Sequence, residues 1–309
     1  WYWFMKEYII IPDIHADIDR LERSLEVAGD TPVAFLGDFI DAGKLTKQVD
    51  EESVLSRVRR LVDSGRAVAV MGNHELNAIL YHRKDADGAW LRAHTAAKTK
   101  QHQSFIETFG AGTKEAKAWT DWFLTLPLWY ELDGLRLVHA CWDDTAIELI
   151  KARRPDGRLH ADDLPEVAAA TSSFGKAVER LLSGPEVSLP CGYMFHDTNN
   201  HERHNVRLAW WRPEATTWRE ACLSVPNPDE LPSGAIPPDT AALLYSADAS
   251  PVFVGHYKMN GAPCIEAPNA ACLDYPARPC VYRWRAGEAL SASNLLTIDV
   301  DEDCHWVAV

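Results

Sequence analysis

Three segments near the start of the chain share one pattern and decide the fold: YIIIPDIH (residues 8–15), PVAFLGDFID (32–41) and AVAVMGNHE (67–75). Each is a short apolar run followed by a tight polar loop, which is typical of a buried strand that ends at a turn. Between them, residues 18–28 and 54–62 carry apolar side chains at helical spacing, and Gly29 and Gly65 end these two helices. The order strand–helix–strand–helix–strand predicts a parallel sheet with right-handed crossovers.

The remainder of the chain alternates between helical and β-type segments. Residues 76–127 are polar with helical patterns, and residues 143–190 indicate further helices with loops. Toward the end of the chain, short apolar runs again predict strands. Strands at both ends around a helical middle predict an α/β fold. We expect one domain over residues 1–309, with cap-like helical insertions at about 76–135 and 143–240.

The composition bounds the class of protein. The chain has 309 residues, 47% of them hydrophobic, which is enough to bury a large core and excludes wholesale disorder. The net charge of −14 argues against a nucleic-acid partner, because phosphate binding needs a surplus of Lys and Arg. No stretch reaches the roughly 18 apolar residues of a membrane span, so we expect no membrane partner.

Cysteine usage and the N-terminal residues bear on the compartment. The seven cysteines are odd in number and form no CxxC pair, which predicts reduced thiols that pack in the core. The first residues lack the basic region and the small-residue cleavage site of a secretory signal. We therefore expect a cytoplasmic protein.

Side chains that bind metals follow each of the three strands, in the patterns DxH, GDxxD and GNH with an acid: Asp13, His15, Asp38, Asp41, Asn73, His74 and Glu75. Two later strands end at His139 and at His256. In open α/β sheets, ligands gather at the carboxyl ends of the strands. Composition alone would produce GNH followed by an acid with a probability of about 0.003, so the ordered set is not an accident of composition.

These residue types suit a particular chemistry. Two divalent metal ions about 3.5–4 Å apart can clamp an in-line displacement at phosphorus, and such a site needs one carboxylate shared between the ions. A mixed set of Asp, His and Asn suits Mn, Fe or Zn better than Ca. Water between the ions becomes a hydroxide near neutral pH, and a separate acid must protonate the leaving alkoxide.

The ordered blocks from Asp13 to His256 resemble those of the calcineurin-like metallophosphoesterases, most closely the serine/threonine phosphoprotein phosphatases and their phage and bacterial relatives. Much of that superfamily ends in GHxH, whereas the block here has Lys258 in the last position, as is normal for the phosphoprotein phosphatase branch. The resemblance implies a two-sheet β-sandwich flanked by helices and a dinuclear metal centre. It also implies hydrolysis of phosphomonoesters, on a phosphoprotein or a small phosphoester, by a hydroxide that bridges the metals.

The resemblance assigns a role to each residue of the blocks. Asp13 and His15 would hold the first metal, and Asp38 would bridge both metals. The second metal would also be bound by three further residues: Asn73, His139 and His256. His74 would be the general acid, oriented by the carboxylate of Asp41.

One departure concerns the phosphate. The phosphoprotein phosphatase branch has an Arg directly after GDxxD that grips the phosphate, and this chain has Ala42 there. A phosphate dianion still needs donors opposite the metals. The candidates, in order of preference, are Arg212, Arg207 and Lys44. A salt bridge on the acidic surface is the alternative role for each arginine.

Several alternatives stay open. The same metal chemistry would serve a dinucleoside polyphosphate hydrolase, and the two insertions would decide between the substrates. The fold could also serve as a non-catalytic binding module, although the presence of both Asp41 and His74 argues against it. Outside the motifs, we expect a polar loop rather than a third metal site at His196, His201 and His204. Core packing is the expected role of Trp210 and Trp211, with a base-stacking platform as the alternative.

Overall fold

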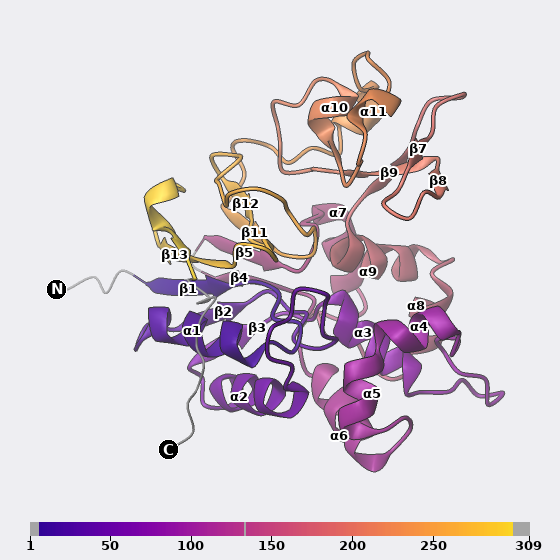
Figure 1. Ribbon diagram of the computed structural model, residues 1–309, viewed down its shortest axis with the longest axis vertical. Helices are drawn as coiled ribbons and strands as arrows, with labels where there is room; N and C mark the ends of the chain where they lie inside the picture. Colours follow the sequence, from indigo (N-terminus) through magenta and orange to yellow (C-terminus); the bar gives the residue numbers. More distant parts are fainter. Residues whose placement is uncertain (1–5, 133, 299–309) are drawn as a thin grey trace.

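Two β-sheets face each other in the middle of the molecule, in a computed structural model that describes residues 6–132 and 134–298 (Figure 1). The first sheet has five strands, in the spatial order β14 (Leu295–Thr297), β13 (Cys280–Arg285), β1 (Glu7–Ile11), β2 (Val33–Phe35) and β3 (Ala67–Ala69). The strands β1, β2 and β3 are parallel, with Ile9 beside Val33 and Val33 beside Ala67. This confirms the parallel sheet expected from the first three segments.

The second sheet has four strands, in the spatial order β12 (Ala270–Cys272), β11 (Val252–Val254), β5 (Leu135–Val138) and β4 (Trp129–Leu132). The first three are parallel, and β4 runs antiparallel to β5. One core cluster fills the space between the sheets, with Ile10 and Leu36 from the first and Leu137 and Phe253 from the second. The fold is therefore the two-sheet sandwich that the sequence predicted.

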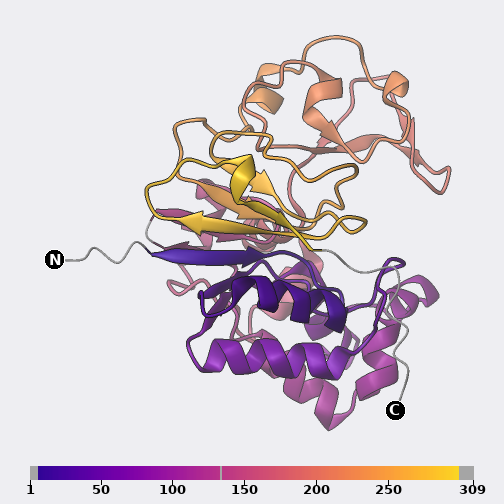
Figure 2. The same ribbon diagram turned by 60° about the vertical axis from the view of Figure 1, so that its left-hand side comes forward.

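Two helices connect the parallel strands of the first sheet and cover its outer face (Figure 2): α1 (Ile18–Ala28) and α2 (Glu51–Asp63). Successive side chains of a strand point to opposite faces. In β1, Ile9 and Ile11 therefore pack in the cluster under the helices, while Ile10 faces the other sheet. The side chains of Asp17 and Asp50 cap the helices by accepting backbone N–H groups of the first turn.

The first insertion carries four helices: α3 (Asn73–Tyr81), α4 (Ala96–Gln101), α5 (Gln103–Phe109) and α6 (Lys114–Phe123). The second insertion begins with three more: α7 (Asp144–Lys151), α8 (Leu164–Ala169) and α9 (Ser173–Ser183). Beyond Ser183 it also contains short strands: β6 (Glu186–Ser188), β7 (Phe195–His196), β8 (Glu202–Arg203), β9 (Asn205–Leu208) and β10 (Cys222–Leu223). Strands of two to four residues are too short to leave an alternating pattern in the sequence.

The remaining elements are short: α10 (Trp218–Ala221), α11 (Pro238–Ala241) and the 3-10 helices Pro228–Glu230 and Ala292–Asn294. The segment with α10 and α11 lies at one end of the long axis, and α5 and α6 lie at the other (Figure 1). Among the described residues, no helix combines the length and the apolar character that crossing a membrane requires.

Candidate metal centre

The six predicted metal ligands meet at the carboxyl ends of five strands. Four of them follow strands of the first sheet: Asp13, His15, Asp38 and Asn73, the last at the start of α3. The other two follow strands of the second sheet: His139 and His256. Five of the six are buried, with Asn73 partly exposed. The sandwich therefore places residues that are as far as 243 positions apart in sequence around one point.

The backbone bends sharply at three of the ligands. His15, Asp38 and His256 have φ angles of 51°, 53° and 73°, in the left-handed region that favours glycine. A residue with a Cβ pays about 1–3 kcal/mol for such a conformation, which persists only where the surroundings enforce it. The hydrogen bond from the His256 backbone N–H to the Asp13 carboxylate, at 3.0 Å, is one such constraint.

Two glycines leave room for the carboxylates. A Cβ on Gly72 would lie 2.2 Å from Oδ1 of Asp38, and a Cβ on Gly255 would lie 1.9 Å from Oδ1 of Asp13. Real Cβ atoms do not approach an oxygen so closely. The glycines of the GNH and GH blocks are therefore needed because the backbone packs directly against two ligands.

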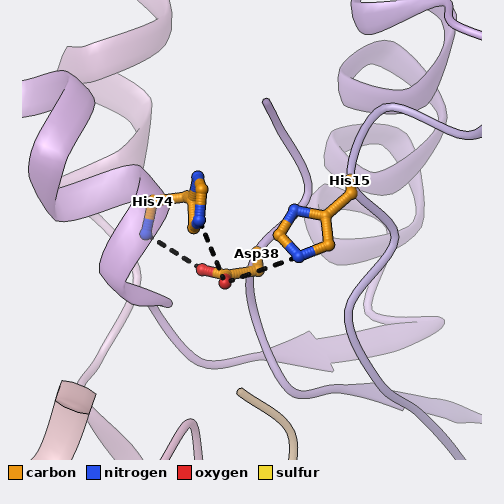
Figure 3. Close-up of side chains that lie close together, drawn as sticks. All are labelled: His15, Asp38 and His74. Atoms are coloured by element: carbon orange, nitrogen blue, oxygen red, sulfur yellow. Dashed lines mark hydrogen bonds and ion pairs between the residues drawn. The ribbon is translucent and has the colours of Figure 1, made fainter. Parts of the chain in front are cut away.

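The first cluster of ligand atoms surrounds Asp38, with His15 on one side and His74 on the other (Figure 3). The Nε2 atoms of His15 and His74 lie 4.0 and 3.9 Å from Oδ2 of Asp38. The Nε2 atom of His15 also lies 3.9 Å from Oδ2 of Asp13. Ligands that bind one Zn-sized ion at 2.0–2.2 Å are about 3–3.5 Å apart, so a small contraction would complete this site.

The second cluster is joined to the first through the same carboxylate. Oδ2 of Asp38 lies 3.4 Å from Nε2 of His139. Oδ1 of Asn73 lies 2.9 Å from Nε2 of His139 and 2.8 Å from Nδ1 of His256. Asp38 thus belongs to both clusters, which is the arrangement that a two-metal site needs.

The histidine rings are oriented as metal ligands are. Nδ1 of His15 donates to the carbonyl of Ile40 at 3.2 Å, and Nδ1 of His139 donates to the carbonyl of Leu36 at 2.7 Å. Each ring thereby turns its Nε2 toward the centre, where a bound cation would favour the unprotonated form. Within the described chain, the buried Nε2 atoms of His15 and His256 have no hydrogen-bond partner. A divalent cation would satisfy these lone pairs, so the residues present fit the metals that the family implies.

Burial and neighbouring charges shift the pKa values of the cluster. Burial raises the pKa of Asp13 well above its usual range. Burial also opposes ionisation of Asp38, but His139 and His74 outweigh it and hold the pKa of Asp38 well below its usual range. Burial, together with the charge of His74, lowers the pKa of His15 to about 3. Bound cations would favour the deprotonated form of all these ligands.

The residues predicted as general acid and partner form a close pair. Nδ1 of His74 lies 2.7 Å from Oδ2 of Asp41, and Nε2 of His74 faces Asp38. Burial opposes protonation of His74, but the charges of Asp38 and Asp41 raise the pKa of His74 to about 9. Asp41 also accepts from His102, at 2.6 Å, and no sequence motif marked that residue.

Of the residues predicted to bind phosphate, Arg212 lies in a salt bridge. Its Nη2 is 2.6 Å from Oε1 of Glu266, and its Nη1 donates to the carbonyl of Glu220. This is the alternative role that the sequence left open for an arginine on an acidic surface. Lys44 is exposed in the loop after Asp41.

Arg207, on β9, acts on one of the predicted ligands. Burial, the charge of His139 and the positive charge of Arg207 together hold the pKa of His256 well below its usual range. Arg207 lines a cavity of about 920 Å³ together with Tyr257 and Lys258, the two residues that follow His256. Its own ion pair, to Glu186, is loose at 3.7 Å.

Two buried acids, Glu75 and Asp274, support the predicted ligands. Glu75 accepts the backbone N–H groups of Asp38 and Gly72 at 2.8 and 2.9 Å, and so ties the second and third loops together. The place of Glu75 directly after Gly72-Asn73-His74 is the sequence signal that could have revealed this supporting role. Asp274 lies behind Asp13, raises its pKa, and accepts from the backbone of Lys258 at 2.7 Å.

Three further groups of residues lie outside the centre: two tryptophans, three histidines and the cysteines. Trp210 and Trp211 are fully buried, which confirms core packing. His196 lies 3.2 Å from Glu230, and His201 and His204 lie in the exposed segment around β8. The six cysteines in the described ranges are free thiols, and four of them are buried as expected. Core packing is wrong for Cys191 and Cys264, which are exposed, and Cys304 lies outside the described ranges.

A sequence model of the calcineurin-like phosphoesterases matches residues 7–257. The chain therefore belongs to this family of metal-dependent phosphoesterases, and it is a hydrolase. No curated protein sequence matches the chain.

Solved structures that are similar to this chain have low sequence identity. A protein serine/threonine phosphatase from Saccharomyces cerevisiae, similar to human phosphatase PP5, is 12% identical, with 97% of this chain and 81% of that chain covered and a TM-score of 0.50. A structure described as a putative diadenosine tetraphosphatase is 14% identical, with 97% of both chains covered and a TM-score of 0.45. The metallophosphoesterase from Sphaerobacter thermophilus is 19% identical over 44% of this chain and 47% of that chain, with a TM-score of 0.29.

Proposed function

We propose that this chain is a metal-dependent phosphomonoesterase of the serine/threonine phosphoprotein phosphatase type, with a phosphoprotein or a small phosphoester as substrate. The observation that carries the proposal is Asp38, one carboxylate shared by two clusters of ligand side chains. When bound, two divalent ions (Mn, Fe or Zn) supply a nucleophile derived from water and offset the charge of the phosphoryl group.

The ligands divide into two sets around Asp38. Asp13 and His15 would hold one ion together with Asp38. Asn73, His139 and His256 would hold the other ion, again together with Asp38. Backbone carbonyls fix the rings of His15 and His139 before any ion binds. Because the rings are already oriented, binding and catalysis need little rearrangement of the protein.

His74 donates the proton that the leaving alkoxide needs. Its Nε2 faces the centre, while Asp41 accepts from Nδ1 and so favours the protonated ring. In the metal-free chain, burial is outweighed by the charges of Asp38 and Asp41, which raise the pKa of His74 to about 9 and so favour the protonated ring. His74 also lies in the first cluster of possible ligands, so metal analysis of a variant must separate an acid from a ligand.

Arg207 is the strongest of the three predicted phosphate-binding residues. It lines the cavity beside Tyr257 and Lys258, and its guanidinium is free to leave the loose pair with Glu186. Arg212 would first have to release Glu266. Lys44 offers only a point charge on a flexible stem, in place of the two parallel donors of a guanidinium.

The test is hydrolysis by purified protein loaded with Mn, Fe or Zn. We expect turnover of para-nitrophenyl phosphate and of a phosphoserine peptide, and none by Asp38→Ala. Turnover of a dinucleoside polyphosphate without turnover of either monoester would identify the alternative anhydride hydrolase. No turnover of any phosphorylated compound with any of the three metals would favour the non-catalytic binding module.

A further inference from the structure

A small pocket opens beside Asn73. Its volume is about 220 Å³, and it lies between α3 with the following loop and the helices α8 and α9. Arg92 and Lys98 supply two positive charges to its lining, against one negative charge from Glu179. In a chain with a net charge of −14, such a local excess of positive charge favours an anion.

Arg92 is held in place without being neutralised. Its Nη1 donates to Oδ1 of Asn77, and its Nη2 donates to Oε1 of Gln101 at 2.8 Å. Both partners are neutral amides, and across the described ranges Arg92 forms no ion pair with a carboxylate. Burial of the unpaired charge lowers the pKa of Arg92. An anion in the pocket would supply the missing negative charge.

The contacts of Arg92 place it on the side of the general acid. Asn77 follows Asn73 by about one turn of α3, so Arg92 is bonded to the helix that carries a predicted metal ligand. Gln101 directly precedes His102, which bonds to Asp41, the partner of His74. The negative charge of Asp41 acts on Arg92 directly.

We propose that Arg92 and Lys98 form a subsite for an anionic group, phosphate or carboxylate, on the leaving group of the substrate. The subsite rests on the proposed role of His74, because the acid marks the side from which the leaving group departs. The substrate class is then a phosphoester whose leaving group carries a second negative charge. The guanidinium fork of Arg92 fits either anion with two parallel hydrogen bonds.

Matched substrates test this subsite in the metal-loaded enzyme. We expect a higher kcat/KM for 3-carboxyphenyl phosphate than for phenyl phosphate, and a loss of that preference by about tenfold in Arg92→Gln, as a charged hydrogen bond predicts. The control is Arg83→Gln, which removes the same charge from an arginine already paired with Asp121. Equal values for both substrates in the wild type would overturn the subsite while the phosphoesterase activity stands.

A second readout does not depend on catalysis. Tripolyphosphate should bind to the metal-free protein in calorimetry, and Arg92→Gln should weaken this binding about tenfold while Arg83→Gln leaves it unchanged. Unchanged affinity in Arg92→Gln would overturn the subsite, even if no phosphomonoester proved to be a substrate.

The hydrogen bonds of Asp41 carry a second, independent inference. Its Oδ2 accepts from His74 at 2.7 Å, and its Oδ1 accepts from His102 at 2.6 Å. His102 is 4% exposed and lies between α4 and α5, 61 positions after Asp41. One carboxylate is thus clamped between two imidazole rings, and only one of them faces the metal centre.

The ring of His102 is held in turn by His82. The Gly112 backbone N–H donates to Nδ1 of His82 at 3.1 Å, so the proton of a neutral His82 lies on Nε2. That Nε2 lies 3.0 Å from Nε2 of His102, which accepts the hydrogen bond, and Nδ1 of His102 then donates to Asp41. Burial lowers the pKa of His82 to about 4, in agreement with a neutral ring.

We infer that His102, supported by His82, is a positioning residue that fixes Asp41 and thereby the ring of His74. This inference also rests on the proposed role of His74. If His102 positions the acid His74, His102→Leu should lower kcat for an alkyl phosphate about tenfold more than it lowers kcat for para-nitrophenyl phosphate. KM should stay unchanged for both substrates. His102→Asn should restore part of the loss, because the amide can donate in place of Nδ1.

The control is His94→Asn, which changes an exposed histidine of the same segment that is bonded to the carbonyl of Tyr81 and not to Asp41. Its activity on both substrates should equal that of the wild type. An equal loss on both substrates in a folded His102→Leu would assign His102 a structural role and overturn the inference. So would full activity of that variant on the alkyl phosphate.

Discussion

Asp38 concentrates the proposed chemistry in one side chain, because its carboxylate belongs to both ligand clusters. We expect Asp38→Ala to lose the second ion and nearly all activity without unfolding, since its carboxylate faces the other ligands from a loop after β2 and is not part of the apolar core. Metal analysis of the folded variant checks this expectation. Two ions per chain in Asp38→Ala would contradict the assignment of Asp38 as the bridge.

His74 is expected to behave differently from the ligands. His74→Ala should keep both ions, because the proposal makes this residue an acid and not a ligand. The variant should lose most activity on alkyl phosphates, whose leaving group needs a proton, and less on aryl phosphates, which leave unaided. Loss of an ion from His74→Ala would instead make His74 a ligand, as its place near His15 and Asp38 allows.

Gly72 tests the close packing of backbone against a ligand. An added Cβ would lie 2.2 Å from Oδ1 and 2.4 Å from the backbone nitrogen of Asp38, so the loop must move. We expect Gly72→Ala to lower the free energy of unfolding by about 1–3 kcal/mol and to weaken metal binding. Gly43→Ala is the matched control, because the nearest atom to its Cβ is 3.8 Å away. Urea unfolding of the two variants should differ accordingly.

At the scale of elements, the start of α2 contains a buried acid that predicts a pH dependence. Oε1 of Glu51 accepts from the Asp41 backbone and from Ser104, while burial, together with the charge of Asp41, raises the pKa of Glu51 to about 8 from 4.5. The folded state therefore holds this proton more tightly than the unfolded chain does. Its stabilising effect is complete below pH 4.5 and is lost as the pH rises toward 8.

The slope from this one group is at most about 1.4 kcal/mol per pH unit. Glu51→Gln cannot titrate, so its free energy of unfolding should fall less between pH 5 and pH 8 than that of the wild type. Urea unfolding of the metal-free proteins at both pH values measures the difference. Parallel pH profiles for the two proteins would show that Glu51 keeps an ordinary pKa in the folded state.

The elements that the sequence predicts well are those with local patterns. The apolar runs before Asp13 and Asp38 sufficed to predict parallel strands, and the ligands then had to meet because the carboxyl ends of such strands lie together. Other contacts join distant parts of the chain. Arg212 pairs with Glu266, 54 positions away, and His102 bonds to Asp41, 61 positions away. No local pattern encodes such contacts, so the sequence could not rank the phosphate-binding candidates or reveal the second histidine.

At the scale of the whole molecule, the centre joins the two sheets. Four ligands follow β1, β2 and β3 of the first sheet, and the other two follow β5 and β11 of the second. The core between the sheets, which includes Ile10 and Phe253, is apolar and closely packed, so it sets the distance between the two groups of ligands. Bound ions would therefore act as cross-links between the layers as well as cofactors.

This role predicts that metal binding stabilises the fold as a whole. An ion that binds only the folded chain, at 100 times its Kd, adds about 2.7 kcal/mol to the free energy of unfolding. We expect urea unfolding with Mn to occur at higher denaturant than unfolding with a chelator. The increment should be smaller in Asp38→Ala, because this variant loses the second ion and removes one ligand from the first. The same increment in the wild type and in Asp38→Ala would place the stabilising ions elsewhere in the molecule.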